Sequence, residues 1–168
     1  MRYVDNIYQI KNILPANDFL LLLDEFHSLY NPWRFTKNET EIGWMHPNRG
    51  CLHKPHAKFD TIGDNLLFIK YGSHLKYVCE KYIGTRIKLT RINTNIQFFG
   101  QESDFHTDGY EGSWTLNLFV NKEWDTTWGG HFVVQTEDKD YFYYPYIPNN
   151  AILFPGDLEH MGHAPNVC

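Results

Sequence analysis

Residues 86–98 read RIKLTRINTNIQF, and this stretch decides the fold class because polar and apolar side chains alternate along it. Every second residue of an extended chain points to the same face of its sheet. One face of the predicted strand carries Ile92, Thr94, Ile96 and Phe98, and the other carries Ile87, Leu89, Arg91, Asn93, Asn95 and Gln97. The alternation predicts that the chain turns to β structure after Gly84.

Four more β segments are expected downstream, at 114–121, 131–136, 141–147 and 151–154. Clusters of Gly, Asn, Asp and Pro separate them, as is typical of turns between short strands. Short strands at this spacing predict an antiparallel sandwich or barrel.

Upstream, apolar residues recur at helical spacing in two segments. One helix is predicted from Asn17 or Asp18 to Tyr30, and a second from about Asp64 to Tyr82. A glycine, Gly84, follows the second helix and is expected to end it. Residues 36–60, between the two helices, lack periodicity and predict a long loop.

The chain has 168 residues, of which 42% are hydrophobic, which suffices for the core of one domain. We expect a single domain over 1–168, with helices and loops over 1–84 supporting a β core over 85–168. The formal charge of −5 argues against a nucleic-acid partner. No apolar run reaches the roughly 18 residues of a membrane span. Three scattered cysteines and the lack of a signal peptide predict a soluble cytoplasmic protein of a reducing compartment.

The motif His106-Thr107-Asp108 suggests a metal site. On a strand, residues two apart point the same way, so one imidazole and one carboxylate can converge on an ion. A later histidine would complete a 2-His-1-carboxylate triad, which leaves positions open for oxygen chemistry on iron(II). The alternative is a turn at Asp108-Gly109 stabilised by local hydrogen bonds.

Four segments in order extend this motif. They are NIQFFGQ at 95–101 followed by His106-Thr107-Asp108, LFVNKEW at 118–124, WGG at 128–130 and ILFPGDLEH at 152–160. Together they resemble the prolyl-4-hydroxylase-like branch of the iron(II)/2-oxoglutarate-dependent oxygenases, over roughly half of the chain.

The resemblance implies a double-stranded β-helix (jelly-roll) core. It implies Fe(II) held by His106, Asp108 and His160, with His163 as the rival third ligand. It further implies 2-oxoglutarate and O2 as cosubstrates, and ascorbate as a possible cofactor. The implied reaction hydroxylates an unactivated C–H bond, first of all C4 of a proline in a peptide or protein substrate, and releases succinate and CO2.

The sequence departs from this branch in its anchor for 2-oxoglutarate. Relatives carry a basic residue beyond the distal histidine, whereas this chain ends at Cys168. We therefore expect the sequence to lack the last strand of the core, or Arg91 to substitute for the anchor. Phe119 stands where relatives often carry a tyrosine. The residues expected to bind the cosubstrate are Arg91, Asn95, Gln97, Thr115 and Asn117.

The substrate-binding residues are the least constrained by the sequence. His131 follows a Gly-Gly pair, where relatives often carry an acidic residue, and with Trp128 and Tyr143 it is a candidate for contacting substrate. The aromatic run at 141–146 favours either a groove for an extended peptide or a half-buried strand. The histidine-rich stretch at 36–60 is interpreted either as a lid or as a solvated loop.

Three other functions fit parts of the pattern. An oxygenase of this fold could act on a small molecule or on another residue, because the fold does not fix the substrate. Two histidines and a carboxylate also suit zinc, as in a hydrolase or isomerase of the cupin kind. A non-catalytic jelly-roll binding protein would explain the missing basic anchor.

Overall fold

The computed structural model describes residues 6–27, 34–36, 51–57, 68–90, 92–100, 102–136 and 138–167. The strands are β1 (Tyr8–Ile10), β2 (Arg34–Thr36), β3 (Cys51–Ala57), β4 (Ile92–Ile96), β5 (Trp114–Leu118), β6 (Phe132–Gln135), β7 (Tyr141–Tyr144), β8 (Ala151–Pro155) and β9 (His160–Gly162). The helices are α1 (Ala16–His27) and α2 (Ser73–Ile83), with a π turn at Phe68–Gly72 and a 3-10 turn at Thr126–Trp128.

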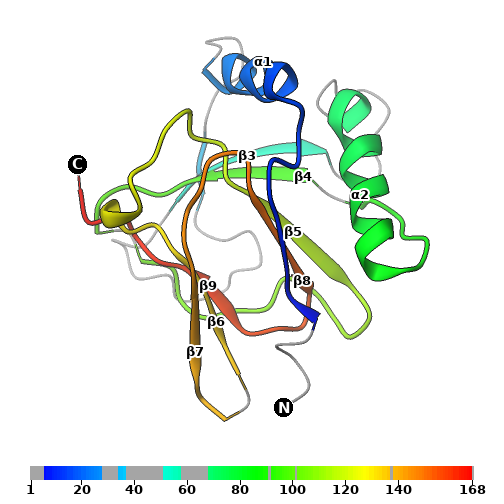
Figure 1. The fold of residues 1–168 in the computed structure, drawn as a ribbon. Coiled ribbons are helices and arrows are strands. Elements are labelled where there is room, and N and C mark those ends of the chain that lie inside the picture. Colours follow the sequence, from blue (N-terminus) through cyan, green and yellow to red (C-terminus); the bar gives the residue numbers. More distant parts are fainter. Residues whose placement is uncertain are drawn as a thin grey trace.

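The described strands form three antiparallel sheets, in the orders β1-β8-β5, β2-β3-β4 and β7-β6-β9. Figure 1 shows α1 and α2 on one side of the β1-β8-β5 sheet and the β7-β6-β9 sheet on the other. The molecule is therefore mainly β, with helices as support, as the sequence predicts.

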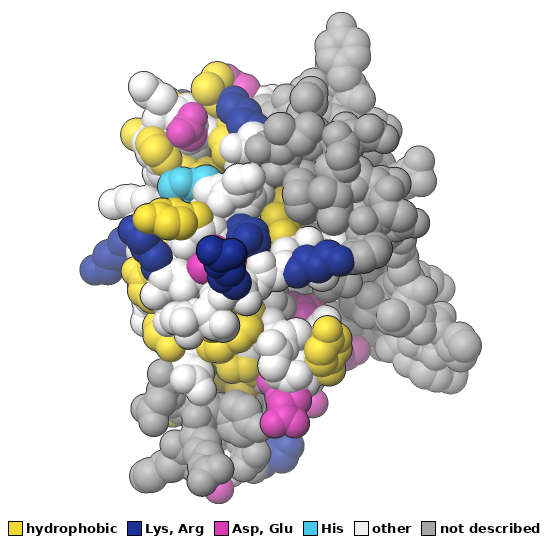
Figure 2. All heavy atoms as spheres, turned by 90° about the vertical axis from the view of Figure 1, so that its right-hand side faces the viewer, with side chains coloured by type: hydrophobic (Ala, Val, Ile, Leu, Met, Phe, Trp, Pro, Cys, Tyr) yellow, Lys and Arg dark blue, Asp and Glu magenta, His cyan; other side chains and the backbone are white. Residues whose placement is uncertain are grey.

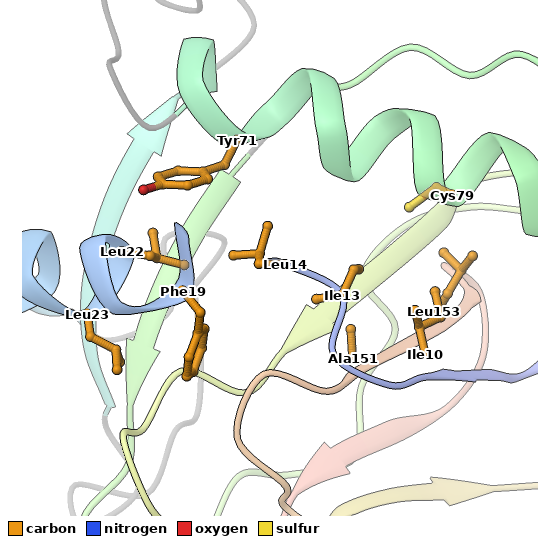
Figure 3. Close-up of a cluster of buried hydrophobic side chains, with 10 residues drawn as sticks. All are labelled: Ile10, Ile13, Leu14, Phe19, Leu22, Leu23, Tyr71, Cys79, Ala151 and Leu153. Atoms are coloured by element: carbon orange, nitrogen blue, oxygen red, sulfur yellow. The ribbon is translucent and has the colours of Figure 1, made fainter. Parts of the chain in front are cut away.

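The first hydrophobic core lies between the helices and the β1-β8-β5 sheet. Figure 3 shows the buried side chains of this core, among them Leu22 of α1, Cys79 of α2, and Ala151 and Leu153 of β8. On β5, the alternate residues Trp114, Leu116 and Leu118 pack against the same core. Complete burial of one such leucine contributes about 1.5–3 kcal/mol to folding.

The second core lies on the other face of β8. Ile152 and Phe154, which alternate with Ala151 and Leu153, pack against Phe132 and Val134 of β6. Since β8 is apolar on both faces, it joins the helical layer to the β7-β6-β9 sheet.

The two predicted helices exist, with shifted ends. The first begins at Ala16, so the prediction of Asn17 or Asp18 as its start was late. The described part of the second helix begins with the π turn at Phe68–Gly72, and residues 64–67 of the predicted helix lie outside the described residues. Gly84 ends this helix in the left-handed conformation, at φ 76°, which a residue without Cβ adopts at no steric cost.

The N-terminal half contains strands that the sequence analysis missed. The predicted loop over 36–60 was wrong for 51–57, which form β3 between β2 and β4. The rest of that loop, apart from Thr36 in β2, lies outside the described residues. Similarly, 1–84 is more than helices and loops, because β1 pairs with β8. The strand predicted from Ile87 begins at Ile92.

Basic side chains gather on one face of the molecule. Figure 2 shows Lys and Arg side chains gathered on the face that α2 covers. The exposed basic residues in and around this helix are Lys70, Lys81, Arg86 and Lys88. A net charge of −5 did not predict this face, and the absence of a nucleic-acid partner stays a prediction. No helix in the described part of the chain has the length and apolarity needed to cross a membrane.

Candidate metal centre

Three side chains that the sequence singled out meet in the structure. One ligand atom from each of His106, Asp108 and His160 lies within 4.8 Å of the other two. His106 Nε2 lies 3.8 Å from Asp108 Oδ1, and His160 Nε2 lies 3.5 Å from Asp108 Oδ2. This is the one group of three potential metal ligands found among the described residues.

Backbone hydrogen bonds tie all three residues to one short segment. His106 and His160 form an isolated antiparallel bridge, in which each N–H donates to the other's carbonyl at 2.9 Å. The N–H groups of Asp108 and Gly109 both donate to the carbonyl of Gly156, at 2.9 and 2.8 Å. The turn from Gly156 to His160 is thus the common scaffold of the site.

Each imidazole is oriented by its own Nδ1. His106 Nδ1 lies 2.8 Å from the carbonyl of Asp104, and His160 Nδ1 lies 2.8 Å from the carbonyl of Leu158. Because a carbonyl only accepts hydrogen bonds, Nδ1 carries the proton in both rings. In the neutral rings Nε2 then keeps its lone pair, and both Nε2 atoms face Asp108.

The site is walled on one side and open on the other. The His160 side chain is 6% exposed, and its ring contacts those of Phe132 and Phe154 at centroid distances of 5.3 and 4.7 Å. The His106 side chain is 45% exposed. A ligand would therefore reach the site from the His106 side.

Asp108 remains ionised at neutral pH. Burial disfavours its charge and raises the pKa. When His160 and His106 are protonated, an Nε2–H of His160 and the charges of both rings favour the ionised carboxylate, and together with Thr115 they outweigh burial, so the pKa of Asp108 lies below its ordinary value. An ionised carboxylate is the form that binds metal.

The donor set fits a divalent transition metal. Two donors at adjacent positions of one ion, each at about 2.1 Å, are about 3 Å apart. The observed separations of 3.5 and 3.8 Å run to different oxygens of Asp108, and all three ligand atoms lie within 4.8 Å of one another, so the side chains would have to move closer together around an ion. Two imidazoles and one carboxylate suit iron(II) and also zinc.

The residues predicted to bind the cosubstrate have different surroundings. Thr115 and Asn117 pair across the strands with Phe154 and Ile152, so they share the face of the second core. Thr115 is among the groups that hold the pKa of the Asp108 carboxyl below its ordinary value. No hydrogen bond from another described residue reaches the amide of Asn117.

The structure says less about the other residues that were predicted to bind the cosubstrate. Gln97 donates from Nε2 to the carbonyl of Gly162, at 3.1 Å, beside the strand that begins with His160. Arg91 lies outside the described residues, and so does the position of the Asn95 side chain. Phe119 is buried in the second core, where its ring contacts Tyr146.

The rival histidine and two substrate candidates lie on the other face of the β7-β6-β9 sheet. Val134 pairs with His160, and Tyr143 pairs with Val133, so alternation turns Tyr143 away from the triad. The His131 ring contacts those of Tyr143 and His163, at 6.3 Å each. His163 Nε2 lies 3.4 Å from Glu102.

Trp128, the third substrate candidate, belongs to the 3-10 turn and makes an edge contact with the ring of Trp124. No contact joins it to the triad within the described part of the chain. The structure therefore brings together the three predicted metal ligands, and it does not bring the three substrate candidates to them.

Sequence reasoning missed the residues that hold Asp108 in place. Gly156 accepts two hydrogen bonds at the triad and donates its own N–H to the carbonyl of Ser113, at 2.8 Å. A Cβ on Gly156 would clash with the Ser113 hydroxyl. The Pro155-Gly156-Asp157 triplet is a turn signal that could have separated the apolar strand from His160.

Gly156→Ala should therefore destabilise the protein by about 1–3 kcal/mol, the usual range for overpacking, and should weaken metal binding. Urea unfolding and a metal titration measure the two effects. In a Ser113→Gly background the same change should cost clearly less, because the clashing hydroxyl is gone. Equal losses in both backgrounds would show that Gly156 is needed for another reason.

No model of a known protein family matches this sequence, and no curated protein matches it. Solved structures match over nearly the whole chain. A prolyl-4-hydroxylase from Pseudomonas putida is similar with a TM-score of 0.72 at 12% identity, over 96% of this chain and 87% of that one. A prolyl hydroxylase from Trichoplax adhaerens, in complex with a peptide fragment of hypoxia-inducible factor, gives 0.70 at 16% identity, over 96% and 79%.

A third similar structure is an epimerase rather than a hydroxylase. The non-haem α-ketoglutarate-dependent epimerase SnoN from nogalamycin biosynthesis gives a TM-score of 0.63 at 12% identity, over 97% of this chain and 72% of that one. Identities this low show a shared fold. The chain therefore has the fold of the non-haem, 2-oxoglutarate-dependent oxygenases.

Proposed function

We propose that this chain, as a single domain with a double-stranded β-helix core, is an iron(II)- and 2-oxoglutarate-dependent dioxygenase. In this proposal His106, Asp108 and His160 hold the metal. One observation carries it: two imidazole Nε2 atoms and one ionised carboxylate converge, each imidazole being oriented by its Nδ1 hydrogen bond. The fold shared with oxygenases supports the same chemistry.

Different side chains of the site would bind the metal, admit the substrates and exclude water. Three ligands on one side of an ion leave three adjacent positions free. The exposed His106 side gives cosubstrate and substrate access to them, while Phe132 and Phe154 exclude water behind His160. When bound, iron(II) supplies the redox chemistry that divides dioxygen between 2-oxoglutarate, giving succinate and CO2, and a substrate C–H bond.

Asn117 is the described side chain best suited to bind 2-oxoglutarate by hydrogen bonds. It lies two residues from Thr115 on the inner face of β5, where a polar group needs a partner. Gln97 and Arg91 remain further candidates for this role.

We propose a peptidyl proline, hydroxylated at C4, as the substrate. Two of the similar structures are prolyl hydroxylases, and one of them holds a peptide. The exposed Phe142 ring of β7 is available to an extended peptide on the triad face of the sheet, because Phe142 pairs with Val134 and Val134 pairs with His160. The similarity to SnoN supports a second candidate, an oxygenase of a small molecule.

Turnover tests the proposal. The protein is incubated with iron(II), 2-oxoglutarate, dioxygen, ascorbate and a panel of proline-containing peptides, while succinate and peptide mass are followed. The expected result is succinate release together with a peptide mass gain of one oxygen atom. Zinc-loaded protein is the control and should give neither. Succinate release without a mass gain on any peptide would favour the small-molecule candidate, and the absence of succinate would contradict the enzyme.

A further inference from the structure

We infer that Thr115 is a positioning residue whose hydroxyl fixes the Asp108 carboxylate for metal binding, rather than a ligand of the cosubstrate. This inference rests on the proposed metal centre. It assigns to β5 a function in the site beyond carrying the Asn117 amide.

The faces of β5 place Thr115 beside the triad. Leu116, the residue after it, packs against the helices, so Thr115 points the other way. Its partner across the strands is Phe154, and side chains of such a pair share a face. The Phe154 ring in turn contacts the His160 ring at 4.7 Å. The Thr115 side chain therefore points toward the His160 ring.

Hydrogen bonds of the backbone bring Asp108 to the same place. The Asp108 N–H donates to Gly156, and the Gly156 N–H donates to the carbonyl of Ser113 on the approach to β5. Gly156 thus links Asp108, through backbone hydrogen bonds, to the residue that precedes β5. This arrangement places the Thr115 hydroxyl and the Asp108 carboxylate on the side of β5 that faces His160, and Thr115 is among the groups that lower the pKa of that carboxyl.

A hydrogen bond from Thr115 would fix which oxygen of the Asp108 carboxylate faces the metal. A carboxylate has two oxygens, and here one lies 3.8 Å from His106 and the other 3.5 Å from His160. Without a further hydrogen bond, the carboxylate is able to rotate and to exchange the positions of its two oxygens. A hydroxyl donor engages one oxygen and leaves the other for the metal, and outer partners of this kind contribute about 10–100-fold to metal affinity.

Thr115→Val tests the inference, because valine keeps the shape and removes the hydroxyl. Anaerobic titration with iron(II), and with cobalt(II) read by its visible ligand-field bands, gives the metal Kd. We expect Thr115→Val to raise that Kd about 10–100-fold and to change the cobalt(II) spectrum. Thr115→Ser restores the donor and should return both close to the wild-type values.

Two controls keep the result interpretable. The melting temperature of each metal-free variant shows whether the fold survives, and Thr115→Ala is the substitute if valine does not fold. Thr126→Val removes an exposed hydroxyl outside the site and should change nothing.

The outcomes separate the inference from the proposed function. A wild-type Kd in Thr115→Val, or a change confined to the KM for 2-oxoglutarate, would overturn the inference and leave the dioxygenase standing. Failure of the wild-type protein to bind iron(II) would overturn both.

Discussion

His160→Ala should lower the affinity for iron(II) more than about 100-fold, since even partners outside the ligand set contribute 10–100-fold. The substitution removes one of three ligand atoms. It also opens a cavity beside Phe132 and Phe154, whose rings pack on the imidazole. Anaerobic titration of the metal-free protein measures the loss, and succinate release should vanish with it.

His163→Ala is the matched control. It removes a histidine three residues further on, which lies beside Glu102 and His131 rather than beside Asp108. Its metal Kd should stay close to the wild-type value. If His163→Ala removes binding while His160→Ala spares it, the ligand set derived from the geometry is wrong.

Phe154→Ala should lower the free energy of unfolding by about 3–5 kcal/mol, the usual cost of deleting a buried aromatic ring. Phe154 is 0% exposed and contacts Phe132 and His160. A typical domain is stable by only about 5–15 kcal/mol, so much of the stability is at stake. Urea unfolding of the metal-free protein measures the change.

Phe99→Ala provides the comparison for the same residue type. Phe99 is 58% exposed, and its truncation should change the stability by no more than about 0.5 kcal/mol. A loss of about 1 kcal/mol or less in Phe154→Ala, which is the ordinary effect of a substitution, would contradict a core that joins the helical layer to the metal-bearing sheet.

The sequence predicts β6 and β8 well because their side chains alternate between defined surroundings, whereas it misses the short strand β9 at His160–Gly162. The apolar run at 151–154 becomes β8, which is buried on both faces, and 131–136 contains β6. In both strands the residues that are apolar enough to be buried are also the residues that pair with a neighbouring strand. The apolar pattern of the sequence therefore coincides with the strand, although it does not predict the pairing itself.

The missed strand β3 shows the limit of such patterns. Its sequence, CLHKPHA, has no apolar alternation and contains a proline. Pairing with β2 and β4 by backbone hydrogen bonds creates this strand, and a register shift between Pro55 and Ala57 accommodates the missing N–H. Side-chain patterns do not report backbone pairing.

For the site, the sequence predicts the types of ligand better than their surroundings. His106 and Asp108 are two apart, but they lie on an isolated bridge and a bend rather than on a regular strand. His160 does not continue β8, because a turn at Gly156 separates them. The orientation of Tyr143 away from His160 depends on which residues pair between β6, β7 and β9, and the sequence does not give that register.

Anaerobic titration of the metal-free wild-type protein with iron(II) and 2-oxoglutarate together tests the central claim most directly. A 2-oxo acid that chelates iron(II) through its carboxylate and keto oxygens gives a weak visible charge-transfer band, which neither component gives alone. We expect this band to saturate at one iron per chain and to be absent in His160→Ala. No band at saturating iron(II) and 2-oxoglutarate, or the same band in His160→Ala, would contradict a metal held by His106, Asp108 and His160.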